Sequence, residues 1–355
     1  MKKKVCFYIF VAAAVLLLLL RAEEVIRYSE EAMRICYELI IPTLFPFFVC
    51  SSLLVYSGFG SVLSRMFRGI MRPLFNVAPA GAAAFVLGII SGYPLGALTA
   101  SQLYKCGALS KAEAERLLSF CSNSGPLFII GSIGVSLYGK PGYGAVLYAI
   151  HILSSVTVGI LFRGYGKSRH PSPAMELRTE DLPLTEVFSR SLRKSVESIL
   201  TVCFSIIFFS ALSRTLLSIA SLPPLLDAAA SGLCEFSTGV LKISMLDKSI
   251  YTKLILTSFI VGFSGIGVHL QVMAVTADSG LSLNPYIIGK LLHGTIAAAL
   301  TAAAFAMIKP AASVFSPAAA TLSASSAVSV SMIAAAAAVT AGAALIVKLT
   351  ALAKK

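Results

Sequence analysis

The chain has 355 residues, of which 57% are hydrophobic and only 13% are charged, and its formal net charge is +13. Soluble globular domains usually carry about 25% charged residues, so this composition argues against a large soluble α-helical protein. Many lysines and arginines fall in short segments between apolar runs, where they set membrane topology, and no RNA- or DNA-binding motif accompanies them. We therefore predict an all-α integral membrane protein of the cell membrane, with about eight transmembrane helices, that contacts the lipid bilayer and no nucleic acid.

The first element, within residues 1–33, is a basic start at 2–4 followed by the apolar run 5–20. A secretory signal has the same layout, so cleavage is an open alternative. The apolar run is slightly long for a signal, and residues 21–24 offer no clear small-x-small cleavage site. These features favour a retained signal-anchor helix with a cytoplasmic N-terminus, followed by an outer amphipathic segment.

The next unit, residues 34–163, contains apolar runs that are too long for a soluble core. One membrane crossing needs about 20 apolar residues, and the uncharged run 73–104 exceeds that length. Its middle, Ser91-Gly-Tyr-Pro-Leu-Gly96, combines glycine with proline and predicts two half-helices separated by non-helical backbone. Such backbone survives at membrane depth only where it is buried in protein or lines a wet cavity.

A second break is predicted a little further along the chain. Ser110 and Glu113 have the spacing of a capping box, which predicts a short amphipathic helix beginning there. That helix runs into Ser122-Asn-Ser-Gly-Pro126, where the glycine and proline again predict an interruption. The chain then continues into the apolar stretch 127–138 and a further span near 141–162.

The rest of the chain divides into a polar loop, a second apolar unit and a tail. Residues 164–195 are rich in lysine, arginine and proline and are predicted to form a cytoplasmic basic loop. Residues 196–308 are predicted to form the second unit, and residues 309–355 an Ala-rich C-terminal helix. The spans of the second unit are expected near 196–219, 223–245, 254–277 and 285–307.

The two units align without a gap when the chain is shifted against itself so that Gly88 falls on Gly262. Ser110 then falls on Asn284. Both stretches are typical of a half-helix, a glycine-containing break, a second half-helix and a capped helix, which predicts an internal duplication. Paired broken segments in corresponding halves point to a transporter-type binding site. The uncertain number of crossings leaves the relative direction of the two copies open.

Polar groups inside the apolar runs are the candidate site residues, because an ionisable residue within a membrane is a functional candidate by default. His269 and Gln271 follow the break of the second unit, and Lys290 and His293 lie three residues apart, on one helix face. Broken helices also expose backbone groups and helix ends that can bind ions or solutes. The predicted substrate-binding residues are Ser91, Gly92, Tyr93, Pro94, Gly96, Ser122, Asn123, Ser124, Gly125, Pro126, Ser264, Gly265, Gly267, His269, Gln271, Lys290 and His293.

Each of these residues also has a purely structural interpretation. A buried histidine can be satisfied by a neighbouring carbonyl, Lys290 can extend to the membrane surface, and His151 is expected to be a packing residue. Asp227 and Glu235 are expected at an aqueous edge, with a Glu235–Lys290 pair as the alternative. The sequence contains no catalytic motif, dinucleotide fingerprint or metal-ligand spacing. We therefore predict neither an enzyme nor a cofactor or metal site.

These segments resemble the sporulation integral membrane protein family of the YlbJ type, which belongs to the nucleoside-recognition (Gate) group. The resemblance covers about residues 34–308 and implies a role in endospore formation and a nucleoside-transporter-like fold, without implying a particular substrate. Gly125 before Pro126 departs from the Ser-Pro-Leu-Phe that is usual in such proteins. The residues that carry the resemblance are Ile41-Pro-Thr-Leu-Phe-Pro-Phe-Phe48, Gly88-Ile-Ile-Ser-Gly-Tyr-Pro-Leu-Gly-Ala97, residues 113–131 and Gly262-Phe-Ser-Gly-Ile-Gly-Val-His-Leu-Gln271.

Two functions are compatible with these features. The first is a transporter or channel-like protein for a small-molecule solute, with its pathway between the two units. The second is a non-transporting scaffold that organises spore-envelope assembly by binding other sporulation membrane proteins. In a scaffold the basic loop or the lipid-facing surface would carry the function, and substitutions of His269 and Gln271 would be tolerated.

Overall fold

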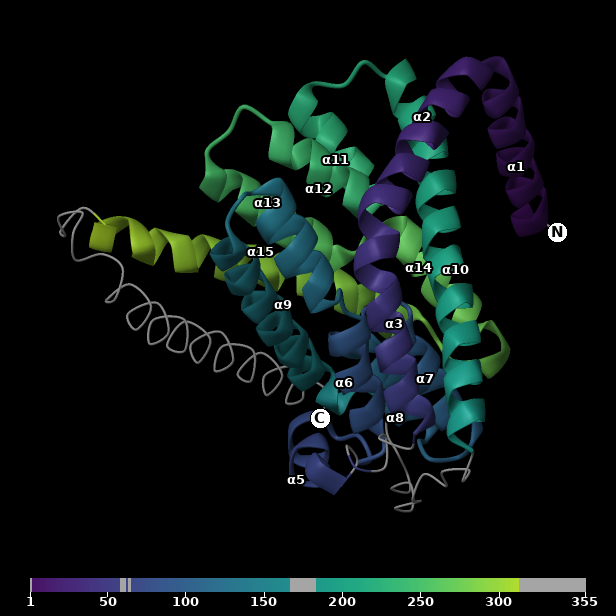
Figure 1. Ribbon diagram of the computed structural model, residues 1–355, viewed down its shortest axis with the longest axis vertical. Coiled ribbons are helices and arrows are strands. Elements are labelled where there is room, and N and C mark those ends of the chain that lie inside the picture. The colour runs from purple at the N-terminus through teal and green to yellow at the C-terminus, as the bar shows by residue number, and fades with distance from the viewer. Residues whose placement is uncertain (1, 58–61, 63–64, 167–182, 313–355) are drawn as a thin grey trace.

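The computed structural model describes residues 2–57, 62, 65–166 and 183–312 (Figure 1). Within these residues every regular element is a helix, which agrees with the predicted all-α class. The elements are α1 (Lys2–Leu20), α2 (Ala22–Ile35), η1 (Cys36–Ile40), α3 (Ile41–Tyr56), α5 (Arg68–Ile70), η2 (Met71–Phe75), α6 (Gly81–Ser91), α7 (Leu95–Lys105), α8 (Lys111–Cys121), η3 (Leu127–Leu137), α9 (Pro141–Leu161), η4 (Phe162–Gly164), α10 (Leu184–Ile219), α11 (Pro224–Cys234), α12 (Phe236–Met245), α13 (Ile250–Phe263), α14 (Gly265–Thr276), η5 (Ala277–Ser279) and α15 (Asn284–Ala312).

Four stretches of the described chain are long and apolar enough to cross a membrane. They are Pro141–Gly164, Leu184–Ile219, Ile250–Ser279 and Asn284–Ala306. Shorter apolar helices add to them in α1, α6 and η3. The chain is therefore a multi-pass membrane protein, whereas the number of about eight spans stays a prediction.

The first hairpin is formed by α6 and α7, which fold back on each other around Gly92–Pro94. Gly88 and Gly96 meet where the two helices cross, and both lie against the backbone of Cys121. The predicted break at residues 91–96 is confirmed, because α6 ends at Ser91 and α7 begins at Leu95. The second half-helix, however, returns alongside the first.

The second hairpin is formed by α11 and α12, with its tip at Glu235. Gly232 and Gly239 meet at its crossing, and Asp227 near its open end pairs with Lys242. The single span predicted at 223–245 is therefore wrong. Two short helices side by side give a more compact element because the glycines let their backbones approach closely.

Two further helices are interrupted without folding back. The first break lies between α8 and η3, where residues 122–125 are not helical. The second break lies at Ser264, which takes a left-handed conformation (φ 79°) between α13 and α14. The capping box that was predicted to start α8 is present, since Ser110 and Glu113 bond each other's backbone N–H.

The same order of elements occurs twice, once from α3 to α9 and once from α10 to α15. Each copy consists of a leading helix, a hairpin, a broken helix and a long helix. One constant spacing relates the copies, and it pairs Ser122 with Ser264 at the two breaks and His151 with His293 on the two long helices. The predicted alignment is wrong in register, because it pairs the first hairpin with the second broken helix.

The two copies run in opposite directions. Ser195 of α10 donates to Ser52 of α3 at 3.2 Å, and Cys36, just before α3, contacts the Cys203 carbonyl at 3.7 Å. These pairs show that the equivalent helices α3 and α10 are antiparallel, and Figure 1 shows them side by side. An inverted repeat of this kind is common in secondary transporters.

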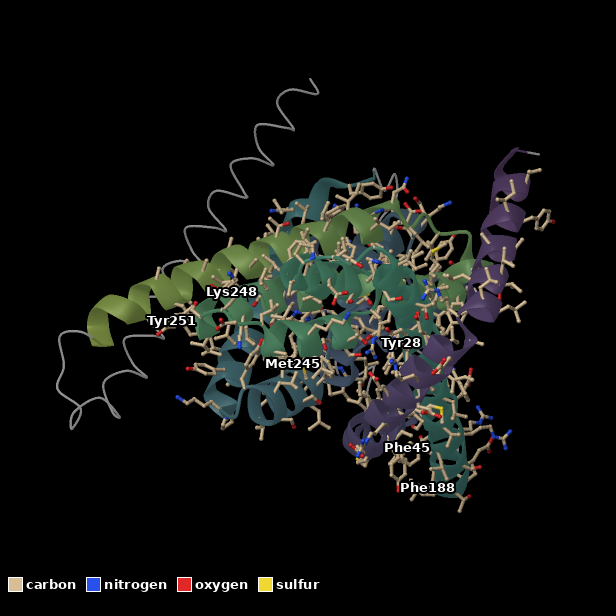
Figure 2. The ribbon with its side chains drawn as sticks, turned by 90° about the horizontal axis from the view of Figure 1, so that it is seen from above. Tyr28, Phe45, Phe188, Met245, Lys248 and Tyr251 are labelled. Atoms are coloured by element: carbon tan, nitrogen blue, oxygen red, sulfur yellow. The ribbon has the colours of Figure 1, made fainter. Side chains whose placement is uncertain are left out.

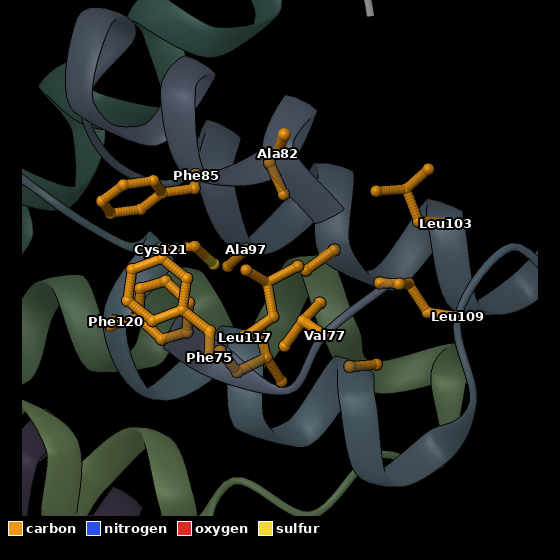
Figure 3. Close-up of a cluster of buried hydrophobic side chains, with 14 of the residues drawn as sticks. Phe75, Val77, Ala82, Phe85, Ala97, Leu103, Leu109, Leu117, Phe120 and Cys121 are labelled. Atoms are coloured by element: carbon orange, nitrogen blue, oxygen red, sulfur yellow. The ribbon is translucent and has the colours of Figure 1, made fainter. Parts of the chain in front are cut away.

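A cluster of buried hydrophobic side chains surrounds the first hairpin (Figure 3). Phe75 and Phe120 stack with ring centroids 4.6 Å apart, and Phe85 of α6 leans on both rings. Leu117 of α8 and Ala97 of α7 fill the remaining space without measurable exposure. The first hairpin is thus enclosed by protein on most of its surface.

The outer surface of the long helices is apolar, as expected for contact with lipid. Phe204 and Phe208 of α10 are more than half exposed, and Figure 2 shows Phe188 and Met245 also directed outward.

Two further predictions concern the polar loop and the tail. Helix α10 begins at Leu184, inside the loop predicted at 164–195, while residues 167–182 and 313–355 lie outside the described residues.

Candidate functional site

A partly open cavity, with about 580 Å³ of empty space including its mouth, is lined by both hairpin tips, by the first break and by the part of α14 that follows the second break. Among the predicted site residues, those that line it are Ser91, Gly92, Tyr93, Ser124, Gly125, Gly267 and Gln271. Phe48 of α3 and Ser205 of α10 close the cavity from the side of the leading helices. Both copies of the repeat therefore contribute to one site.

The tip of the first hairpin is held in place by Tyr93. Its hydroxyl donates to the Val261 carbonyl at 2.9 Å and accepts from the Ser264 hydroxyl at 2.9 Å. The preceding Gly92 has φ 84°, a conformation that glycine adopts without strain. The tip of one copy is thus bonded to the break of the other copy.

A buried polar network lies behind Tyr93, on the side away from the cavity. The Lys290 ammonium donates to the Ser122 carbonyl at 2.9 Å and lies 3.3 Å from Nδ1 of His293. Nε2 of His293 donates to the His151 carbonyl at 2.9 Å, and Nε2 of His151 accepts from the Ser124 N–H at 3.1 Å. The network therefore begins and ends on the first break.

The two histidines are equivalent residues of the two copies, and their rings lie 4.3 Å apart. Contact between equivalent residues of a repeat occurs close to a twofold axis. His151 and His293 therefore mark the approximate axis that relates the copies. The interpretation of His151 as an isolated packing residue misses this contact.

The tip of the second hairpin carries a buried carboxylate. Glu235 is 3% exposed, lines the cavity, and accepts from the N–H groups of Ser237 and Thr238 at the start of α12. The expectation that Glu235 faces an aqueous edge or pairs with Lys290 is wrong. Its oxygens cap its own helix, where a carboxylate is stabilised by the helix dipole.

Several predicted site residues lie outside the cavity wall. His269 packs edge-on against Phe263 and Tyr286, with ring centroids 4.8 Å and 5.2 Å away. Gly96 supports the hairpin crossing, and the Asn123 side chain donates to the Phe120 carbonyl. Of the pair expected to act together, only Gln271 reaches the cavity.

A second partly open cavity, with about 520 Å³ of empty space including its mouth, lies next to the first. Phe48 and Tyr93 line both cavities and form the partition between them. The second cavity extends past Pro94 to Lys194 and Glu197 near the start of α10. The second cavity therefore lies on the side of this partition that faces the N-terminal part of α10.

Comparison with known proteins places this architecture in a family. The family model described as nucleoside recognition, named Gate, matches residues 39–222. The sporulation integral membrane protein YlbJ of Bacillus subtilis (strain 168) is 31% identical over an alignment of 327 residues, and the alignment covers 82% of this chain and 79% of that protein. The chain belongs to the YlbJ-type family of sporulation integral membrane proteins, within the nucleoside-recognition (Gate) group. No solved structure matches it.

The matched region of the family model runs from α3 through α10 and so contains the first hairpin, the first break and α9. The family resemblance found in the sequence is confirmed by both comparisons. The similarity to the Bacillus protein covers more of the chain than the Gate match does.

Only a weak signal in the sequence points to the site residues that were missed. Glu235 and Phe236 occupy the second tip, and Glu235 is the equivalent of Tyr93 in the register that pairs Ser122 with Ser264. Phe236 contacts Tyr93 and Phe128, with ring centroids 5.6 Å and 5.0 Å away. The correct repeat register is the signal that would have brought these residues together.

Proposed function

We propose that this protein moves a small solute across a membrane during endospore formation, by way of the central cavity. The observation that carries the proposal is that one partly open cavity is lined by elements of both inverted copies: the two hairpin tips, the first break, and the half-helix α14 that follows the second break. Secondary transporters place their substrate at such a meeting point of broken helices.

The chemistry of the wall supports binding of a polar molecule. Gln271 offers an amide, Ser91 and Ser124 offer hydroxyl groups, and Glu235 offers a carboxylate edge. The rings of Phe128 and Phe236 supply flat apolar surface beside these groups. A few convergent polar groups on a mostly apolar wall are typical of small-molecule sites.

Membrane orientation follows from the distribution of positive charge. Arg72 and Arg163 lie at one end of the molecule, where Asn76 bonds to the Arg163 carbonyl, and α10 begins at this end as well (Figure 1). Under the positive-inside rule this end is cytoplasmic, and the N-terminus before α1 is cytoplasmic too. The second cavity then opens toward the cytoplasm.

A role in sporulation rests on the relative, whose name describes a sporulation integral membrane protein. The description of the Gate model makes nucleosides the first solutes to test.

The test replaces Gln271 by Leu in a spore-forming host that lacks its own copy of the gene. We expect loss of spore formation and of solute uptake at unchanged protein level. Gln102→Leu, on the exposed face of α7, is the matched control and should behave like the wild type. If Gln271→Leu sporulates normally, and removal of residues 167–182 abolishes sporulation, the scaffold function replaces the transporter function.

A further inference from the structure

We infer that Lys290, together with His293 and His151, forms a proton-binding site. Protonation of this site holds the backbone of the first break, residues 122–125, in the observed conformation. Lys290 and His293 are fully buried, and His151 is 2% exposed. The site is separate from the cavity wall, because none of these side chains lines the central cavity. That this site binds a proton does not depend on the proposed function. Only the further step, that proton binding is coupled to transport, rests on the proposed function.

The hydrogen-bond directions define what the lysine meets. A carbonyl only accepts, so Nε2 of His293 must carry the hydrogen that it shares with the His151 carbonyl. In the neutral ring Nδ1 of His293 is then an acceptor toward Lys290. The Ser122 carbonyl is also an acceptor, and the Tyr93 ring presents its face 5.5 Å from the ammonium nitrogen. Every neighbour therefore suits the three N–H groups of a protonated lysine.

The surroundings provide acceptors but no opposite charge. Among the described residues, no carboxylate lies within ion-pair distance of Lys290. A lone positive charge inside a membrane protein is costly. The hydrogen bonds of Lys290 therefore favour its charged form, while its burial favours the neutral form. A group in that balance can gain or lose its proton when its surroundings move slightly.

The other titratable groups near the lysine are few. Helix α13 packs on α15 through Gly262 and Gly294, neither of which titrates. Among the described residues, the titratable groups near Lys290 are Cys121 of α8, His151 of α9, Tyr93 at the first hairpin tip, His269 of α14, and Tyr286 and His293 of α15 itself. None of them is an acid at neutral pH. A proton added to Nδ1 of His293 would face the Lys290 amine, and one added to Nε2 of His151 would replace the bond from the Ser124 N–H. Within the network the lysine is therefore the group whose charge can switch without the loss of an acceptor.

Protonation is linked to the backbone of the first break. Lys290 holds the Ser122 carbonyl, and His151 holds the Ser124 N–H, so both sides of Asn123 are fixed by the same network. Addition of one proton to the lysine amine gives an ammonium that strengthens the bond to Ser122, because charged donors form stronger hydrogen bonds. Loss of that proton loosens the break. The Tyr93 ring lies next to the Lys290 ammonium and also lines the cavity, so this side chain is shared by the proton site and the cavity wall.

Hydrogen–deuterium exchange of the full-length protein in detergent tests the site without a solute. Peptides that span residues 118–128 are followed across a pH series and corrected with the same peptides in unfolded form. We expect the wild type to protect the break about fivefold more in acidic than in alkaline buffer, the effect of about one hydrogen bond on an opening equilibrium. Lys290→Met should exchange fast at every pH, and Lys290→Arg, with its permanent charge, should lose the pH dependence.

Lys242→Met is the matched control, since it removes an ammonium from the second hairpin and should keep the wild-type pH dependence. If Lys290→Met does not fold, the wild type and Lys290→Arg still decide the matter. A pH-independent wild type, or a Lys290→Arg protein with the wild-type pH dependence, overturns the proposal. Protection of the break by Na⁺ added in place of N-methylglucamine also overturns it, because a metal ion would then compete for the same carbonyl. Failure of solute uptake alone counts against the proposed function and leaves the proton site intact.

Discussion

The two hairpins have the same design but are held by different contacts. In the first hairpin 14 of the 22 helical residues are buried, against 8 of 21 in the second. The glycines at the first crossing lie against the backbone of Cys121, whereas those at the second crossing meet each other and the side chain of Ile260. We therefore expect the first hairpin to be fixed and the second to be the part that moves.

The two hairpin tips also differ in whether their side chains bond to other helices. Tyr93 at the first tip bonds to Val261 and Ser264 on another helix. Glu235 at the second tip bonds within its own helix, to Ser237 and Thr238. Movement of the second hairpin would leave the bonds of its tip intact and would break two side-chain hydrogen bonds of α12, that of Thr238 with Ser210 of α10 and that of the Ser244 carbonyl with Lys253 of α13. Hinge movement of one element is a usual way to open a site to one side of a membrane.

The largest difference should appear when the glycine crossings are filled. A side chain at Gly88 would overlap the Cys121 carbonyl, where three backbones meet, so Gly88→Val should abolish folding. Gly239→Val would overlap Gly232 only, and α11 can move away toward its exposed side. We expect monodisperse Gly239→Val protein on size exclusion and none for Gly88→Val. Gly142→Val, at an open position, is the control. Equal loss of both proteins would contradict the comparison.

Truncation of an aromatic ring should have the next largest effect. Phe120→Ala removes a ring that is 1% exposed and stacked on Phe75. We expect a loss of about 3 kcal/mol in the free energy of unfolding, as for large-to-small changes in other cores. Phe236→Ala at the second tip, where the ring is only half buried, should cost about 1 kcal/mol. Unfolding in a denaturing detergent series measures both, and a larger loss for Phe236→Ala would reverse the ranking.

Removal of one hydrogen-bonding group at each tip should have a smaller effect. Tyr93→Phe removes the 2.9 Å hydrogen bond to the Val261 carbonyl and leaves the longer one, at 3.5 Å, from the Ser264 hydroxyl, which should cost about 1–2 kcal/mol and raise amide exchange on both sides of Ser264. Glu235→Ala removes the cap of α12 and should cost about 1 kcal/mol, with faster exchange confined to the first turn of α12. Exchange at the second break in the Glu235 variant would show that its tip is tied to the rest of the protein after all.

The smallest effect concerns the ion pair that closes the second hairpin. Lys242 and Asp227 lie 2.7 Å apart with side chains 24% and 32% exposed. Such partly exposed pairs contribute at most about 1 kcal/mol, and salt weakens them. Asp227→Asn should therefore lower the melting temperature slightly in low salt and not measurably in high salt. A large loss that does not depend on salt would mean that this hairpin is held as firmly as the first.

Local patterns allowed a good part of the site to be predicted. Glycine with proline located both interruptions in the first unit, and the Ser110–Glu113 spacing located the start of α8. The joint face of Lys290 and His293 followed from helical geometry alone. These features depend only on residues that are close together in the sequence, so they can be predicted from one sequence.

The features that were missed depend on tertiary packing. A glycine–proline break has the same pattern whether the next helix continues or returns, so the fold-back of α6 and α7 was not visible. In an apolar sequence many registers align glycines and leucines, and the match of Gly88 with Gly262 concealed the register that the structure shows. Glu235 was misplaced for the same reason, because it enters the cavity only when the span predicted at 223–245 becomes a hairpin.

The access of water to the central cavity tests the account most directly. Single cysteines at Ser205, which lines the central cavity, and Ser198, which lines the second cavity, are placed in a chain without native cysteines. Right-side-out and inverted vesicles are then treated with a membrane-impermeant thiol reagent. We expect Ser205→Cys to react from both faces, as the second hairpin opens and closes, and Ser198→Cys to react only from the face that carries the start of α10. Reaction of Ser205→Cys from one face alone would contradict the account.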